Sequence, residues 1–118
     1  MYERNVKLTA PPDGALYLWF EPWAEGWAFP AGSEIELRAR SEFEGELQVE
    51  ETAERTAIYA WPGSTLRALA NGTEVISFDL PVPSGLTRET VEMLFGAAPS
   101  PTAEEKARVV TRPWWKFW

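Results

Sequence analysis

The sequence predicts a mainly β fold, a small barrel or sandwich followed by one or two short C-terminal helices. Its 118 residues are the length of a single domain. Short runs of alternating apolar and polar residues, separated by turn residues, fill the first 80 positions. After Pro83 the pattern changes to helix-capping signals. We therefore expect a β-domain over residues 1–83 and a helical, Trp-rich C-terminal extension over residues 84–118, packed on the same domain.

About seven strands are expected by residue 80, each marked by alternation with a period of two. The clearest covers residues 34–40, where three apolar residues alternate with four charged ones. The pair Asn71-Gly72 predicts a tight hairpin, because both central positions of such a turn adopt positive φ. The remaining strands are expected around residues 6–8, 16–20, 47–49, 56–61, 65–70 and 76–80.

Two short helices are expected after the strands. Thr87 is placed to cap the first, which should run through Phe95 and stop at Gly96. A capping box that starts at Thr102 predicts a second helix to about Thr111.

Composition excludes several kinds of chemistry. The chain has no cysteine and no histidine, which removes disulfides, thiolate metal sites and a cysteine nucleophile, and leaves serine catalysis without its usual base. Residues 1–105 carry 7 basic and 18 acidic residues, so this part of the chain repels a polyanion and nucleic-acid binding is not expected. Without an apolar segment of signal-peptide or membrane-span length, we expect a cytoplasmic protein with no membrane span.

Two segments resemble the motifs of the cupin family. In the first cupin motif a glycine is followed after five residues by His-x-His and then by Glu; here Gly32 is followed by Arg38-Ala39-Arg40 and Glu44. The segment Trp61-Pro62-Gly63 is similar to a shifted version of the Pro-x-Gly turn of the second motif. Both histidines of the first motif are arginine here, and Leu66 stands where the second motif has its histidine.

The resemblance spans about residues 29–80 and implies a small double-stranded β-helix, which is a jelly-roll or cupin-like β-barrel. The family's usual chemistry needs a metal held by three histidines and a carboxylate. An arginine cannot replace a histidine ligand, because it has no lone pair to donate. We therefore expect no metal, no cofactor and no metal-dependent cupin reaction.

The two arginines of the first segment admit two interpretations. If Arg38 and Arg40 pointed into the barrel, near Glu44, they would form a pocket for a carboxylate or phosphate ligand. The alternation of the strand favours the other arrangement, in which the apolar residues between them face inward and the arginines pair with neighbouring acids in solvent.

Residues 21–27 repeat the pattern Glu-x-Trp. In an extended chain the carboxylates of Glu21 and Glu25 would share one face with the indoles of Trp23 and Trp27, an arrangement suited to stacking on a sugar ring. Pro22 and Gly26 favour an edge or bulged segment over a helix. The alternatives are a loop whose tryptophans cover an open end of the barrel, or an indole at a protein interface.

The last seven residues contain four aromatic side chains that need cover. They are Trp114, Trp115, Phe117 and Trp118. This cluster could dock on its own chain or on a dimer mate, serve as a recognition peptide for another protein, or contact a membrane interface.

The function predicted from these features is non-catalytic, metal-free binding that mediates association with a protein partner or a second copy through aromatic surfaces, with no catalytic residue assigned. One alternative is a module for carbohydrate or a small anion, and a small ligand in the barrel mouth fits it. The second alternative is a metal-independent cupin-type enzyme, which needs a cavity that holds a carboxylate or tyrosine of perturbed pKa, for example Glu44 or Tyr59.

Overall fold

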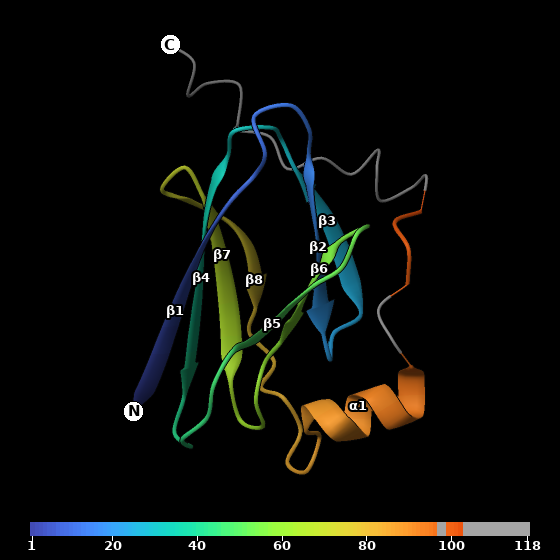
Figure 1. The fold of residues 1–118 in the computed structure, drawn as a ribbon. Coiled ribbons are helices and arrows are strands. Elements are labelled where there is room, and N and C mark those ends of the chain that lie inside the picture. Colours follow the sequence, from blue (N-terminus) through green and yellow to red (C-terminus); the bar gives the residue numbers. More distant parts are fainter. Residues whose placement is uncertain (97–98, 103–118) are drawn as a thin grey trace.

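The computed structural model describes residues 1–96 and 99–102, which form two four-stranded sheets and one helix (Figure 1). Sheet A has the strand order β1-β4-β7-β8, and sheet B has the order β3-β2-β6-β5. The predicted class, mainly β with a short C-terminal helix, is confirmed. The elements are β1 (Tyr2–Thr9), β2 (Leu16–Glu21), β3 (Glu25–Phe29), β4 (Glu34–Ser41), β5 (Gln48–Glu51), β6 (Thr56–Tyr59), β7 (Thr65–Ala70), β8 (Thr73–Phe78) and α1 (Arg88–Phe95).

The two sheets pack face to face, and all their strand pairs but one are antiparallel. The exception is β2 with β6, which are parallel, whereas a jelly roll is built from antiparallel strands. Strand β3 lies at the edge of sheet B, in agreement with the edge segment predicted at residues 21–27. The strand begins only at Glu25. The turn at residues 22–24 therefore separates two strands where the sequence indicated one extended segment.

Strand β4 shows most directly how the sequence sets the sides of a sheet. Ile35, Leu37 and Ala39 are almost completely buried between the sheets, while Arg38 and Arg40 are exposed on the other side. Because successive side chains of a strand point to opposite faces, burial of the three apolar residues turns the arginines outward. The interpretation that places both arginines in solvent is confirmed.

The core lies between the two sheets and is built from the inward-facing residues of both. Pairing places Leu18 and Phe20 of β2 on the same face as Trp27 and Phe29 of β3. The buried members of the core cluster are Ala10, Leu18, Phe20, Phe29, Ile35, Leu37, Ala39, Ile58, Trp61, Leu66, Ala68, Ala70, Ile76 and Phe78.

The predicted helix forms between its two capping residues. The hydroxyl of Thr87 accepts a hydrogen bond from the backbone N–H of Thr90 at 3.3 Å, and Gly96 ends α1 with a positive φ of 77°. Val91 is buried against Ala57 on the outer side of β6. Strand β6 is thus covered by sheet A on one side and by α1 on the other. Most of the expected second helix lies outside the described residues.

The predicted hairpin at Asn71-Gly72 connects β7 to β8. Asn71 has φ of 50° and Gly72 has φ of 84°, the combination that a two-residue hairpin of this type requires. The side chain of Asn71 also accepts a hydrogen bond from the backbone N–H of Glu34 at 3.0 Å, which ties the turn to the start of β4.

Candidate functional site

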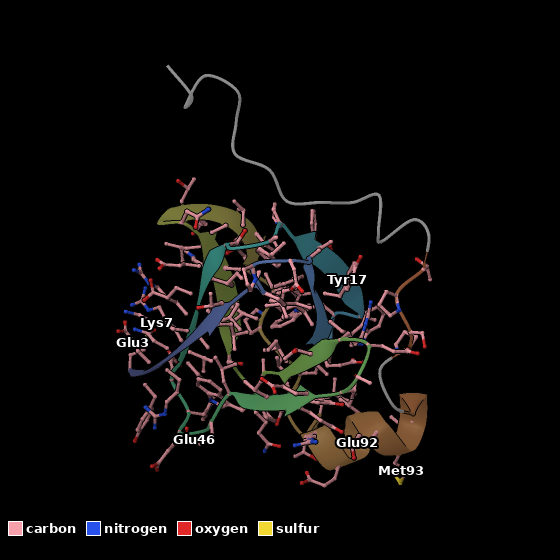
Figure 2. All side chains as sticks on the ribbon, turned by 45° about the horizontal axis from the view of Figure 1, so that its top comes forward. Glu3, Lys7, Tyr17, Glu46, Glu92 and Met93 are labelled. Carbon is pink, nitrogen blue, oxygen red and sulfur yellow. The ribbon has the colours of Figure 1, made fainter. Side chains whose placement is uncertain are left out.

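The outer side of sheet A, which we call the arginine face, carries Arg38, Arg40 and Arg67. Arg38 on β4 lies directly opposite Arg67 on β7, and residues directly opposite each other in a sheet share a face. Arg40 lies one pleat further along β4 on the same side. In Figure 2, Glu3 and Lys7 mark this side of the molecule on β1, with Tyr17 of β2 on the far side. Two like charges directly opposite are unfavourable, so a free face of this kind favours a negatively charged neighbour.

Each arginine has one acidic partner on the same face. Arg38 donates to Glu36 at 3.0 Å, Arg40 pairs with Glu3 at 3.1 Å, and Arg67 pairs with Glu74 at 3.5 Å.

The guanidinium of Arg38 lowers the pKa of Glu36, chiefly through this hydrogen bond. All three arginine side chains are more than half exposed. Such pairs contribute little to stability in water, and they leave most of the guanidinium donors accessible.

The arginine face is hollowed into a depression of about 800 Å³. At the end of β4 the depression is bordered by three nonpolar side chains, Met1, Phe43 and Pro81, which we call the apolar rim. Charged guanidinium groups next to an exposed aromatic ring are typical of the centre of a protein interface, where Arg and aromatic residues are enriched.

Phe43 is the most informative residue of the rim, because the chain holds it in an exposed position. Its ring is 64% exposed. Its backbone N–H donates to the hydroxyl of Ser41 at 2.9 Å, and its backbone C=O accepts a hydrogen bond from Nε1 of Trp61, also at 2.9 Å. A side chain at position 63 would come within 2.5 Å of the Phe43 ring, so Gly63 leaves the space in which the ring lies.

Trp61 fixes the loop that presents Phe43. The indole is buried in the core, and the backbone of Gly45 lies so close to it that an added Cβ would be 2.1 Å from the ring. Arg4 of β1 also pairs with Glu46 of this loop at 3.3 Å. The loop is therefore anchored from the core and from β1, which restricts the positions available to Phe43.

The arginine face is also the part of the described surface that is least acidic. Residues 1–96 and 99–102 hold seven basic residues, and four of them lie here: Lys7, Arg38, Arg40 and Arg67. Six acids lie on the same face: Glu3, Glu34, Glu36, Glu42, Glu74 and Asp79. The rest of the described chain holds three bases and ten acids.

A second polar constellation lies on the outer side of sheet B and attaches α1. Arg88 of α1 donates to Gln48 at 2.9 Å and to Glu50, and its guanidinium lies 4.6 Å from the centroid of the Tyr59 ring. Burial raises the pKa of Tyr59, helped by the charges of Glu50 and Glu92. A tyrosine that is harder to ionise is a poor general base, so these contacts fit a structural role.

Glu21 is the most buried carboxylate of the described chain, at 5% exposure. It accepts a hydrogen bond from Nε1 of Trp19 at 2.6 Å. Burial raises its pKa, and the bond from Trp19 opposes the shift. The guanidinium of Arg55 lies 5.0 Å from the centroid of the Trp19 ring.

The prediction that the Glu21–Trp27 carboxylates and indoles share one face is wrong. The turn at residues 22–24, where Ala24 has φ of 55°, reverses the chain and breaks the alternation. Glu21 faces outward from sheet B, whereas Glu25 accepts a hydrogen bond from Nε1 of Trp27 at 3.2 Å on the inner side.

Trp23 and Trp27 both pack against the core and do not form a flat exposed platform. The Trp23 ring stacks on Phe78 at 4.5 Å between centroids with an interplanar angle of 12°, and its Nε1 donates to the C=O of Leu80 at 3.2 Å. This arrangement supports the alternative in which the tryptophans cover the sandwich.

Of the remaining predicted residues, Glu44 is exposed in the loop next to Phe43 and does not line the depression. Trp114, Trp115, Phe117 and Trp118 lie outside the described residues. Phe43 and Arg67 were not predicted as site residues. A phenylalanine between two acids, in Glu42-Phe43-Glu44, is a signal that could have marked Phe43 as exposed.

Among residues 1–96 and 99–102, no three acidic residues are arranged to hold a metal ion. Within the same ranges, no helix has the length and apolar character needed to span a membrane. Comparison of the chain with protein-family models, with curated proteins and with solved structures finds no match.

Proposed function

We propose that the chain is a non-catalytic binding domain that associates with a protein through the arginine face and the apolar rim. The observation that carries this proposal is the position of Phe43. It is exposed, fixed through both of its backbone polar groups, and placed at the border of a depression lined by three arginines.

Folding alone does not explain why an aromatic ring is held in an exposed position. A solvent-exposed phenylalanine contributes little to folding, whereas the same ring loses little entropy on binding if its backbone is already ordered. Aromatic residues, phenylalanine included, and arginine are enriched at protein interfaces. Phe43 beside Arg40 fits this pattern.

The described structure gives less support to a carbohydrate-binding module and to a cupin-type enzyme. Trp23 and Trp27 are used in packing, which removes the platform that a sugar ring requires. The inward-facing side chains of both sheets form one packed cluster, and the depression lies outside it, on the arginine face. An enzyme site of the cupin kind, inside the barrel, therefore has no counterpart among the described residues.

A site-specific cross-link tests the proposal. A photoreactive benzoylphenylalanine replaces Phe43 in one sample, and in the control it replaces Ala53, which is exposed in the turn between β5 and β6. The cells that express each variant are irradiated. We expect a covalent adduct of defined mass from position 43 only, formed with a second copy or with another protein. Equal adducts from both positions, or none from position 43, would contradict the proposal.

A further inference from the structure

The exposed side of β4 carries its charges in two blocks. Outward positions recur at every second residue, so four of them span about 20 Å along the strand. From the start of β4 to its end these residues are Glu34, Glu36, Arg38 and Arg40. One end of the strand's outer side is therefore acidic and the other is basic.

The strands on one side of β4 extend this polarity. Arg67 of β7 lies opposite Arg38 at the basic end. Glu74 of β8 lies opposite Leu69, which is itself opposite Glu36 at the acidic end. On β1 the order is reversed, with acidic Glu3 beside Arg40 and basic Lys7 beside Glu36, so β1 neutralises part of each block. The polarity is carried by β4 and β7. Glu74 of β8 extends the acidic end, whereas Asp79, bonded to Ser77 opposite Arg67, offsets part of the basic end.

We infer that the protein partner is a second copy of this chain, docked face to face with its β4 antiparallel to the first. The inference rests on the proposed function and names its partner. A two-fold axis that crosses β4 beside Leu37 places Arg38 opposite Glu36 of the second copy and Arg40 opposite Glu34 of the second copy. Because the interface is isologous, each of these contacts occurs twice. The same rotation brings the basic end of β7 toward the acidic end of β8.

Charge selects this face and this orientation. The whole chain has a net charge of −7, so two copies repel each other over most of their surfaces. The arginine face has four bases and six acids, whereas the rest of the described chain has three bases and ten acids, so the repulsion is smaller at the arginine face. A parallel arrangement of the two β4 strands would place arginine against arginine, and like-charge contacts disfavour it.

The size of the face predicts a weak and reversible dimer. Four strands spaced about 4.8 Å apart and on average about seven residues long cover about 450 Å² on each copy. This is below the roughly 800 Å² per partner of stable complexes. Exposed ion pairs are also weakened by salt. We therefore expect association that depends on protein concentration and on ionic strength.

Two charge-reversed variants test the inference. The acidic-face variant combines Arg38→Glu with Arg40→Glu, and the basic-face variant combines Glu34→Arg with Glu36→Arg. Each variant alone has charges of one sign along the outer side of β4 and should stay monomeric in sedimentation, at concentrations where the wild type dimerises. Mixed in equal amounts, they should form a one-to-one heterodimer that native mass spectrometry separates by mass. All four positions carry solvent-exposed or partly exposed side chains, so circular dichroism should show an unchanged fold.

A matched control separates a specific contact from a general effect of charge. The double substitution Glu51→Arg with Glu54→Arg changes the net charge by the same amount as the basic-face variant, at exposed positions on and beside β5. This control should dimerise like the wild type.

Three results would overturn the inference: a wild type that is monomeric up to about 1 mM, reversed variants that do not associate when mixed, or a control that does not dimerise. If the wild type is monomeric while position 43 still cross-links to a different protein, the proposed function stands and only the identity of the partner is wrong.

Discussion

Replacing Gly45 with alanine tests whether the buried indole of Trp61 holds the loop that presents Phe43. An alanine Cβ at position 45 would lie 2.1 Å from two atoms of the Trp61 ring and 2.7 Å from a third. Real Cβ atoms do not approach a ring so closely, so either the loop or the indole must move. The indole has little freedom, because it is buried in the core and donates to the C=O of Phe43.

The magnitude follows from overpacking. Inserting a methyl group into a packed site costs about 1 to 3 kcal/mol, and losing the Trp61 hydrogen bond would add about 1 kcal/mol. For a domain of this size, each kcal/mol lowers Tm by about 4 °C. Urea unfolding followed by circular dichroism measures the loss. The matched control is Gly14→Ala, because nothing lies within 4 Å of a Cβ at position 14. A Gly45→Ala variant within about 0.5 kcal/mol of the wild type would refute the claim that Trp61 fixes this loop.

Three further predictions concern residues outside the arginine face. Because burial raises the pKa of Glu21 in the folded state, its ionisation costs stability as the pH rises above 4.5 and through the folded pKa. Glu21→Gln should therefore gain stability relative to the wild type between about pH 4 and pH 7, measured by urea unfolding at each pH; a constant difference would contradict the shift. Arg88→Leu removes the contacts of α1 with β5 and with Tyr59 and should destabilise the protein by about 1 to 3 kcal/mol, with faster hydrogen exchange in α1; unchanged exchange would show that Arg88 does not anchor the helix. Trp23→Ala removes the stack on Phe78 and should cost about 3 to 5 kcal/mol in thermal unfolding; a stable variant that instead loses retention on glycan columns would favour the carbohydrate alternative.

The sequence predicted the elements whose signals are local. Strand β4 followed from strict alternation, and α1 followed from Thr87 and Gly96 at its two ends. The separation of β2 from β3 was not predicted, because the Glu-x-Trp pattern of residues 21–27 also fits one extended segment. The turn that separates β2 from β3 depends on packing of the Trp23 ring against Phe78, which is 55 residues away in the chain and invisible to a local pattern.

The candidate site also combines features that local sequence patterns predict with features that depend on long-range packing. The outward direction of Arg38 and Arg40 followed from the burial of their apolar neighbours. The position of Arg67 opposite Arg38 depends on the register of β4 and β7, which the sequence does not specify. The fixed position of Phe43 depends on the hydrogen bond from Trp61, which lies 18 residues further along the chain. Long-range contacts of this kind pack the tryptophan pair against the core and bring the three arginines onto one face.

Hydroxyl-radical footprinting tests the central claim most directly, because the chain contains two methionines on different surfaces. Met1 lies on the apolar rim, and Met93 lies on α1 (Figure 2). Their exposures are similar, 73% for Met1 and 77% for Met93, so Met93 is an internal control. If the arginine face and the apolar rim are the interface, oxidation of Met1 and Phe43 falls several-fold on passing from dilute protein to the assembled form, while oxidation of Met93 stays constant. Protection of Met93 with unchanged Met1 and Phe43 would contradict it.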